Sequence, residues 1–564
     1  MAEKDTQPNK ISDNAPGLFG FEGKNALDGT PLSELPDFRE QVPELQPYLL
    51  PFQRVIYVEE NLLNADSALS ARSHPSSSHA LLELMGVTSL KEIGNCGPGN
   101  AAQSLPEHEN DEQVNLLGAL FGRDSLHMGM ALYSSFPNLL KTTAVRLAEL
   151  QGVAANMANE EEPGRIIHWG ADPEDPIAKH ITEVNFWEWP HYGAVDSTPL
   201  FIRGVLKVAK DNPAFLGQTY IGRDNETHTM QDALDAATGW LEKSLQNNPE
   251  GLLEFKMLQE RGIWNQAWKD TPESYMHADG SYANHRQGIA SIEVQALAYD
   301  TLIDLATHYK QQNRGADTQV KAAILESRAA QLKQTVLDKF WIEDESGGYF
   351  ALGTDRDENG QLRPLAVRTS NMGHALHLLE GDSPQLAQRR EELIKTLFSD
   401  ELLDRKGVRT LSDLEARFAP RSYHCGSVWL WDNHVISQEL ERAGYSGLAR
   451  DIDQRIWRTV NTLGFFVEFV PGDNATTPEA MTIRRVIDVY DGERNHFSNS
   501  YRIEKPAQET QAWTVEAIRA IKKKNQPLHP ELSALSAAAD PNKRAFEQRI
   551  LSQAQSGPSG LPNR

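Results

Sequence analysis

Cysteine is nearly absent from this chain, which has only Cys96 and Cys425 in 564 residues. Two cysteines cannot form the disulfide framework of a small secreted fold or a metal site built on several thiolates. No pair of histidines has the spacing of a known metal motif, and Gly-rich nucleotide-binding motifs and a G-x-S-x-G nucleophile elbow are also missing. The sequence therefore predicts no bound metal and no cofactor.

Long apolar runs and positive charge are also scarce. No apolar run reaches about 18 residues, and the first residues, MAEKDTQPNKISDNAPG, lack the apolar stretch of a signal peptide. With 55 Lys and Arg against 79 Asp and Glu, the formal net charge is −24 at pH 7. This charge repels nucleic-acid phosphates and anionic membranes, whereas a neutral ligand is compatible with it. We expect a cytoplasmic protein with no nucleic-acid or membrane partner; nothing in the sequence indicates its oligomeric state.

Helical periodicity dominates the middle of the chain. The stretch TPLFIRGVLKVAK predicts a helix with Thr198 as N-cap and Pro199 at its first position, and Ser383 with Pro384 repeats this signal. Convincing long strands are absent, although GGYFALG favours a short hairpin. Further amphipathic helices are expected near 126–156, 229–247, 288–312, 317–339, 427–444, 446–460 and 509–523.

The segments between these helices are long and rich in Gly, Asp and aromatic residues. They cover 164–197, 261–287, 345–371, 404–427 and 463–509. About a dozen helices separated by such loops favour an all-α toroid, with paired helices as its wall and a pocket formed by loops at one end. Because no linker divides the body, we predict a partly disordered N-terminal extension (1–44), one barrel (45–525) and a C-terminal tail (526–564) containing a short helix or two.

Six of the 11 tryptophans form three close pairs, each beside carboxylates, amides or a histidine. The pairs are Trp187 with Trp189, Trp264 with Trp268, and Trp429 with Trp431. A pyranose has apolar faces rimmed by hydroxyl groups, so its site needs flat rings together with polar side chains. Any one tryptophan is more readily explained as a core residue. Three pairs in polar loops favour sugar recognition.

Breaking an acetal between two sugars requires one protonated and one ionised carboxyl group. Spacing cannot select them among 79 acidic residues, so the candidates are those in aromatic loops: Asp124, Glu188, Asp196, Asp270, Glu293, Asp432 and Glu468. Glu468, in LGFFVEFVPG, is the most unusual, because its neighbours are apolar. It is either half-exposed in a strand-like stretch or held in a partly apolar pocket, which would raise its pKa. Asp124 has an ordinary alternative role as the cap of a helix, and Asp196 could also cap a helix locally.

Several segments resemble motifs of the amylo-α-1,6-glucosidase (glycogen-debranching) family. NQAWKDT resembles its N-Q-x-W-K-D-S motif, FGRDSL its F-G-R-D segment, and HYGAVDSTPLF its Y-G-x-V-D-x-T-P-L-F. Further matches follow in the family's order: GIASIEVQALAYD, RTSNMGHAL, GVRTLS, YHCGSVWLWDN, FFVEF and PAQETQAW. The resemblance spans about residues 115–520 and implies an (α/α)6 barrel that hydrolyses α-glucosides with inversion.

By position in these motifs, the resemblance implies that Asp270 is the general acid and Glu468 the general base. Inversion would place the two carboxyl groups roughly 6.5–9.5 Å apart. The predicted sugar-binding residues, from the motifs and the aromatic loops together, are Arg123, Asp124, Trp189, Tyr192, Asp196, Trp264, Gln266, Trp268, Lys269, Glu293, His424, Trp429 and Asp432.

Three residues that precede Asp270 have roles that the sequence leaves open. Lys269 next to Asp270 would depress the pKa of a general acid, so we expect its ammonium group to point to the sugar instead. Asn265 and Gln266 either order the loop or reach hydroxyl groups of the sugar.

Three departures from the family limit what the resemblance implies. The β-sandwich and glucanotransferase regions of debranching members are absent, Cys425 stands where the family commonly has Asn, and HADGSYANHRQG and NATTPEAMTIRRVIDVYDGERNHFSNSY have no counterpart. We therefore expect a small carbohydrate substrate, such as an α-glucoside. Alternatives are trehalose, a glucosyl- or mannosylglycerate, or a barrel that binds a sugar without hydrolysis or epimerises it through His191, His424 or His434.

Overall fold

The structure is a computed structural model, and the N-terminal extension expected over 1–44 lies outside the residues it describes. The described residues are 120–133, 137–170, 187–258, 262–312, 315–463, 467–481, 484–491, 496–506 and 541–556, with the single positions 179, 182, 514, 517, 518, 520 and 521.

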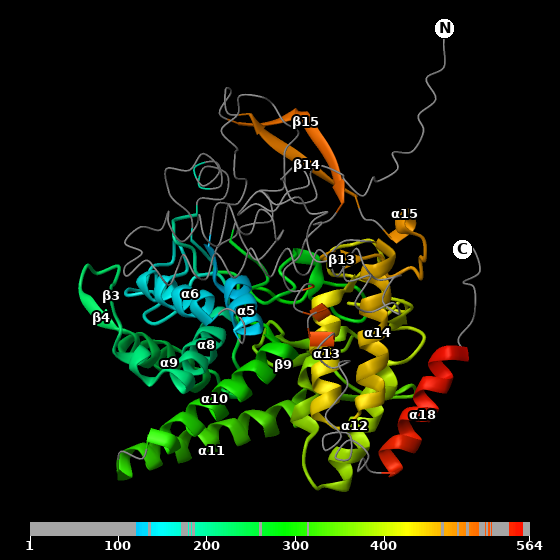
Figure 1. The fold of residues 1–564 in the computed structure, drawn as a ribbon, viewed down its shortest axis with the longest axis horizontal. Helices are drawn as coiled ribbons and strands as arrows, with labels where there is room; N and C mark the ends of the chain where they lie inside the picture. Colours follow the sequence, from blue (N-terminus) through cyan, green and yellow to red (C-terminus); the bar gives the residue numbers. More distant parts are fainter. Residues whose placement is uncertain are drawn as a thin grey trace, which may run out of the picture.

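Helices follow one another in packed pairs (Figure 1). The pairs are α5 (Gly122–Leu132) with α6 (Pro137–Glu149), α8 (Ser197–Asp211) with α9 (Met230–Asn247), α10 (Ile292–Gln312) with α11 (Ala316–Lys339), the 3-10 helix η7 (Ser370–Leu379) with α12 (Pro384–Leu397), and α13 (Leu430–Arg442) with α14 (Ser446–Leu463). The first members also pack on one another in chain order, α5 on α8, α8 on α10, α10 on η7 and η7 on α13. The fold is therefore helix-rich, as expected, with these first helices forming one continuous wall.

Local signals explain several helix starts. Ser383 is the N-cap of α12 with Pro384 at its first position, as the sequence predicts. Helix α9 begins at a capping box in which Thr229 and Asp232 each accept from the other's backbone N–H.

Helix α8 begins earlier than expected. Its N-cap is Asp196 rather than Thr198, so Pro199 occupies the third helical position instead of the first. The Thr198 hydroxyl is already engaged, because it accepts a hydrogen bond from the backbone N–H of Ile166 at 2.9 Å. This contact comes from a segment distant in sequence, which the local pattern could not reveal.

The expected helix near 126–156 is two helices, and the first, α5, starts at Gly122. A Cβ atom at Gly122 would lie 2.1 Å from the carbonyl oxygen of Ile167. Only glycine permits this close approach. The glycine thus fixes where α5 begins and where the next residue, Arg123, is placed.

Strands are short and antiparallel, and three of them lead directly into helices of the wall. Strand β1 (Leu120–Phe121) pairs with β2 (Trp169–Gly170) and runs into α5, and β5 (Ala290–Ser291) pairs with β8 (Gly353–Arg356) and runs into α10. Strand β12 (Val428–Trp429) pairs with β13 (Phe469–Val470) and runs into α13. Because backbone hydrogen bonds hold these strands, they anchor the N-termini of the helices that follow.

The remaining strands do not lead directly into a helix of the wall. They are β3 (Thr219–Ile221) with β4 (Thr227–Thr229), β6 (Trp341–Asp344) with β7 (Gly347–Phe350), β9 (Leu362–Leu365) beside β8, β10 (Leu403–Asp404) with β11 (Gly407–Val408), and β14 (Arg484–Asp491) with β15 (His496–Pro506). The expected GGYFALG hairpin forms with the preceding strand β6 rather than within itself. The β14–β15 hairpin is longer than any strand pair that the sequence led us to expect.

The other helices of the described residues are the short η5 (Pro213–Gly217), η6 (Pro272–Ser274) and α15 (Pro478–Met481), and the longer α18 (Pro541–Ser556). Helix α18 lies in the expected C-terminal tail, where it packs against α14 and buries Phe546. None of the helices in the described ranges is long and apolar enough to cross a membrane.

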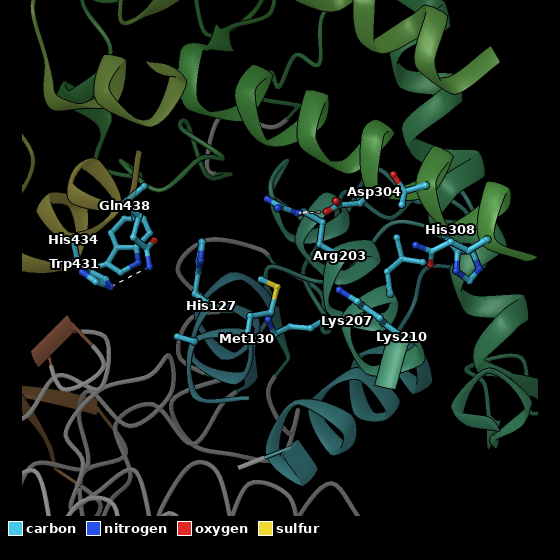
Figure 2. A pocket seen from close by; sticks show the side chains of 15 residues that line it. His127, Met130, Arg203, Lys207, Lys210, Asp304, His308, Trp431, His434 and Gln438 are labelled. Carbon is cyan, nitrogen blue, oxygen red and sulfur yellow. Dashed lines mark hydrogen bonds and ion pairs between the residues drawn. The ribbon is translucent and has the colours of Figure 1, made fainter. Parts of the chain in front are cut away.

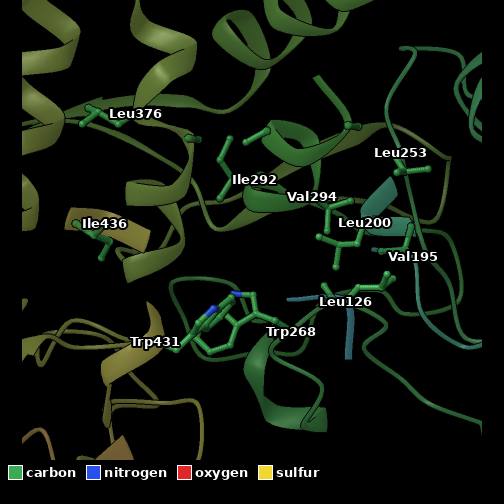
Figure 3. Close-up of a cluster of buried hydrophobic side chains, with 14 of the residues drawn as sticks. Leu126, Val195, Leu200, Leu253, Trp268, Ile292, Val294, Leu376, Trp431 and Ile436 are labelled. Atoms are coloured by element: carbon green, nitrogen blue, oxygen red, sulfur yellow. The ribbon is translucent and has the colours of Figure 1, made fainter. Parts of the chain in front are cut away.

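The core lies between the first helices of the pairs. Leu126 of α5, Leu200 of α8, Val294 of α10 and Ile436 of α13 are all buried there, and Trp268 lies beside them in the loop before η6 (Figure 3). The apolar faces of these helices therefore hold the wall together and support the loop that carries Trp268.

Candidate active site

Four helices of the wall begin with a carboxylate. Asp124 lies in the first turn of α5, Asp196 is the N-cap of α8, Glu293 lies in the first turn of α10, and Asp432 in the first turn of α13. A helix N-terminus carries partial positive charge and favours a carboxylate beside it. The sequence identified all four residues but could not show that their positions in the helices are equivalent.

Arg123 is the centre of a cluster of carboxylates. Its Nε donates to Oδ2 of Asp196 at 2.7 Å, and its Nη1 lies 3.5 Å from Oδ2 of Asp270. The side chains of Arg123 and Asp196 retain only 5% and 7% of their accessible surface, whereas that of Asp270 retains 36%. Asp270 is thus the open member of this cluster.

The cluster contains more carboxylates than cations, and this shows in the pKa values. Burial raises the pKa of Asp124 to about 6, opposed by Arg123 and assisted by repulsion from Asp270 and Asp196. Burial likewise raises the pKa of Asp270 above its ordinary value, although Arg123 lowers it in part. The pKa of Asp196 is raised for the same first reason. Such carboxyl groups can hold a proton closer to neutral pH than ordinary ones.

We expect Asp124→Asn to be more stable than the wild type near neutral pH. The pKa of Asp124 is about 6 in the folded protein and 3.8 in the unfolded chain, so protonation of this carboxyl group stabilises the folded protein. The stabilisation is complete below pH 3.8 and is lost as the pH rises through about 6. The loss amounts to about 2 kcal/mol once partial exposure is considered.

Thermal unfolding of both proteins at about pH 4, 5, 6 and 7.5 tests this expectation. The melting temperature of the variant should exceed that of the wild type only at the higher pH values. Parallel curves at every pH would show that Asp124 carries no such penalty.

Lys269 does not face its neighbour Asp270. Its Nζ donates to the backbone carbonyl of Thr410 at 2.6 Å and lies 5.2 Å from the ring of Trp268. Burial lowers the pKa of Lys269 to about 8, while Asp432 opposes that change. The pKa of Asp270 can therefore be raised although a lysine precedes it, and the contact seen for Lys269 is to the backbone.

Trp268 is the centre of an aromatic group beside the carboxylates. The centroid of its ring lies 5.7 Å from that of Trp429 and 5.5 Å from that of Trp431, both edge to face (Figure 3 shows Trp431). His374, on η7, stacks parallel to it at 6.3 Å, and His424 lies at 5.4 Å. Trp268, from the sequence pair Trp264 and Trp268, thus lies in one aromatic group with both members of the pair Trp429 and Trp431.

The other tryptophans lie apart from this group. Trp264 contacts the rings of Tyr282 and His285. Trp189 packs on Trp169, which the sequence did not single out, and its Nε1 donates to Thr182. The spacing of two tryptophans in the sequence therefore did not decide whether they share a surface.

Glu468 is buried next to this aromatic group. It directly precedes Phe469, which pairs with Trp429 across β12 and β13, and it retains 2% of its accessible surface. Its Oε1 accepts a hydrogen bond from the hydroxyl of Tyr423 at 2.6 Å. Phe465 and Phe466, which the sequence placed beside it, lie outside the described residues.

Tyr423 and His424 connect Glu468 to the segment after Asp270. His424 Nδ1 lies 3.2 Å from the hydroxyl of Thr271, the residue that follows Asp270, and the rings of Tyr423 and His424 are 4.5 Å apart. Side-chain contacts thus link Glu468 to Thr271, the residue that follows Asp270 in the chain.

Glu293 and Asp432 each use one oxygen and leave the other buried. Glu293 Oε1 accepts from Ser291 and Tyr275 at 2.6 and 3.1 Å, and Asp432 Oδ1 contacts His374 Nε2 at 2.7 Å. Within the described part of the chain, Glu293 Oε2 and Asp432 Oδ2 have no hydrogen-bond partner, nor do Arg123 Nη2 and Asp196 Oδ1. Buried polar atoms of this kind are able to bind the hydroxyl groups of a ligand.

Two predicted sugar-binding residues point away from the cluster. The hydroxyl of Tyr192 donates to the carbonyl of Leu150 at 2.7 Å and accepts from Arg223. Gln266 donates to Glu160 at 2.6 Å and accepts from Arg165 at 2.7 Å. Of the two roles open to Gln266, these contacts match ordering of the loop.

The sequence missed several residues that shape the site. Glu160 is buried with a positive φ of 59°, and burial raises its pKa. Together with Arg165 it holds Gln266, and no local signal pointed to either residue. His374 and Tyr423 had a signal, since both lie in segments that resemble family motifs. Glu188, another candidate acid, is exposed and accepts from Asn156.

Carboxyl groups with raised pKa values beside a tryptophan group, in loops between paired helices, form the kind of site expected of a carbohydrate-active enzyme. Comparison with known proteins agrees. A family model described as the mannosylglycerate hydrolase MGH1-like glycoside hydrolase domain matches residues 200–494, just over half of the chain. The chain therefore belongs to this glycoside hydrolase family. No curated protein sequence matches it.

Two structures of the GH63 mannosylglycerate hydrolase from Thermus thermophilus are similar to this chain. The complex with glucose matches over 75% of this chain and 95% of its own, with 13% identity and a TM-score of 0.43. The complex with Tris matches over 73% and 94%, with 12% identity and a TM-score of 0.45. An uncharacterized conserved protein from the same organism matches over 76% and 98%, with 12% identity and a TM-score of 0.45.

Proposed function

We propose that this chain hydrolyses the bond between a terminal α-linked hexose and a small leaving group, with inversion at the anomeric carbon. Asp270 is the general acid and Glu468 the general base. The observation that carries the proposal is Asp270 itself, the open carboxyl of the cluster, whose pKa is raised although a guanidinium group lies 3.5 Å away. A proton donor of this kind must remain protonated near the working pH.

The remaining steps follow from this assignment. Asp270 protonates the oxygen of the leaving group, while Glu468 takes a proton from the water that attacks the opposite face of the sugar. Arg123 and Asp124 bind hydroxyl groups of the terminal sugar, and Trp268 supports its apolar face. We assign further sugar contacts to Asp196, Glu293, His424, Trp429 and Asp432, and a loop-ordering role to Tyr192 and Gln266. Sugar contacts of Trp189, Trp264 and Lys269 stay predictions from the sequence, because the contacts of these side chains lie elsewhere.

We also propose that the described helix pairs belong to an (α/α)6 barrel. Their first members pack in chain order, and His127 of α5 lies 5.1 Å from Trp431 of α13, which brings the two ends of the described wall together. The division into 1–44, 45–525 and 526–564, and a cytoplasmic location, remain proposals from the sequence.

A specific observation favours glycerate as the leaving group. The family matched over residues 200–494 is described as mannosylglycerate hydrolase MGH1-like, so glucosyl- and mannosylglycerate are the second candidate substrates. The resemblance to amylo-α-1,6-glucosidases favours a glucosyl unit instead. The two possibilities differ in substrate and share the same carboxylate chemistry.

A panel of substrates tests the proposal: maltose, isomaltose, panose, trehalose, glucosylglycerate, mannosylglycerate and limit dextrin. Sugar release from at least one small α-glycoside is expected, and proton NMR should show the β-anomer first. Release of none of them would overturn hydrolysis and support a binding or epimerising protein. The α-anomer as first product would contradict inversion.

Tyr423→Phe offers a more selective test of Glu468. The Tyr423 hydroxyl donates to Glu468 at 2.6 Å, and a hydrogen bond to the ionised form lowers the pKa of a carboxyl group. Its removal should shift the acidic limb of the kcat profile to higher pH by about one unit, with less than about a tenfold loss at the optimum. If the acidic limb of the kcat profile stays at the same pH as in the wild type, the result would argue against Glu468 as the base.

A further inference from the structure

A cavity of about 630 Å³ lies between α5, α8, α10 and α13, apart from the carboxylates described above (Figure 2). Its lining residues include His127 and Trp431 on one side and Arg203, Lys207, Lys210 and Asp304 on the other. This volume lies within the range of about 300–1,000 Å³ that is usual for small-molecule sites.

The cavity is separated from the carboxylate cluster by aromatic side chains. Trp431 packs against Trp268 on the side of the cluster and against His127, at 5.1 Å, within the cavity lining. Arg203, Lys207 and Lys210 lie about two to four turns beyond Asp196 along α8. Neither Asp270 nor Glu468 contributes to the lining.

The wall formed by α8 is basic. Arg203, Lys207 and Lys210 are spaced by four and three residues and therefore share one helix face. Arg203 pairs with two carboxylates, Asp304 at 2.8 Å and Asp300 at 3.4 Å, so it adds no net positive charge. In contrast, the described residues include no carboxylate that forms an ion pair with either lysine, and Lys207 has only the ring of Tyr133 at 5.5 Å.

The charged side chains of the lining are three cations and one carboxylate, Asp304, whereas Asp300 and Asp211 lie outside the lining. Burial, together with nearby cations that include Arg203, lowers the pKa of His127 to about 3, so this side chain stays neutral. The C-terminus of α8 contributes a partial negative charge of about half a unit, which two full lysine charges exceed. A positive cavity is unusual in a chain whose formal net charge is −24.

We propose that this cavity binds a small, multiply charged anion bearing phosphate or carboxylate groups, at a site separate from the sugar site. Ammonium groups on a flexible stem suit both kinds of oxyanion. The partly exposed ion pair of Arg203 with Asp304 lies at one edge of the site, and the exposed lysines Lys207 and Lys210 supply the charge that an anion would neutralise.

Isothermal titration calorimetry of the full chain with inorganic phosphate, and separately with citrate, at constant ionic strength tests the proposal. We expect saturable one-site binding of at least one of them to the wild type. Lys207→Gln/Lys210→Gln should weaken this binding by at least about tenfold, or 1.4 kcal/mol. The control Lys243→Gln/Lys339→Gln makes the same charge change at exposed positions of α9 and α11 and should bind like the wild type.

Circular dichroism establishes that the variants are folded; should the double variant fail, Lys210→Gln alone should still weaken binding by about threefold. If phosphate binds and citrate does not, the site is assigned to phosphate groups. If citrate binds and phosphate does not, it is assigned to carboxylates. The proposal is overturned if neither anion gives saturable binding or if the control loses as much affinity as the cavity variant. It is also overturned if the anion competes with the sugar substrate, because the anion would then occupy the sugar site.

Discussion

Replacing Asp270 by Asn is expected to lower kcat by about 10²–10⁴-fold on a natural glycoside. An amide keeps the shape of the side chain, and its oxygen can still face Arg123 Nη1, which lies 3.5 Å from the carboxylate in the wild type. It cannot deliver a proton to the leaving oxygen. The fold should therefore persist while the proton-transfer step fails.

A substrate that needs no protonation separates this role from others. Fluoride leaves without a proton, so the loss on the corresponding α-glycosyl fluoride should be less than about tenfold. Asp382→Asn, at an exposed position with no hydrogen bond in the described structure, is the matched control and should behave like the wild type. Equal losses on both substrates, or a loss below about tenfold on the natural glycoside, would remove Asp270 from the role of acid.

Arg123→Gln should produce the largest loss of stability, about 3–5 kcal/mol near pH 7.5. Arg123 is the buried cation between Asp196, at 2.7 Å, and Asp270, at 3.5 Å, and it also lowers the pKa of Asp124. Without it, like charges face one another with little water to screen them. Since the pKa values of these carboxyl groups would rise further, the variant should regain stability as pH falls toward about 5.

Urea unfolding at about pH 5 and pH 7.5 measures this effect. Arg146→Gln is the control, because Arg146 pairs with Glu149 within α6 and a helical pair of this kind contributes less than about 1 kcal/mol. The assignment of Arg123 fails if both variants lose the same stability at neutral pH. It also fails if the loss in Arg123→Gln does not depend on pH.

Much of the fold could be predicted because its signals are local. The period of apolar residues located α9, α10, α11, α13 and α14 to within a few residues, and Ser383 with Pro384 marked the start of α12. At α8 the pattern failed because a distant segment intervened: the backbone N–H of Ile166 donates to the hydroxyl of Thr198, which the sequence had taken for a cap. The hairpin expected within GGYFALG failed for a local reason, because its partner is the strand just before it.

The candidate site was predictable by residue type but not by arrangement. Polar loops with tryptophans identified Asp124, Asp196 and Asp270, which the structure brings near Arg123, and Glu293, which acts electrostatically on Asp196. Nothing in the sequence showed that the ring of Trp264 would contact His285 rather than Trp268, or that the ammonium group of Lys269 would donate to the carbonyl of Thr410. Glu160, which holds Gln266, carried no signal at all.

The sequence by itself determined the helical character of the chain, its strong negative charge and the loops that carry its unusual residues, because composition and short-range periodicity depend on neighbours along the chain. Only the tertiary structure decided which carboxylates share one guanidinium group, which tryptophans share a surface and which lysines of the described residues remain without a carboxylate. Those contacts join residues far apart in sequence, such as Arg123 with Asp196 and Lys269 with Thr410. Their electrostatic consequences depend on burial, which is a property of the packed helices rather than of any one segment.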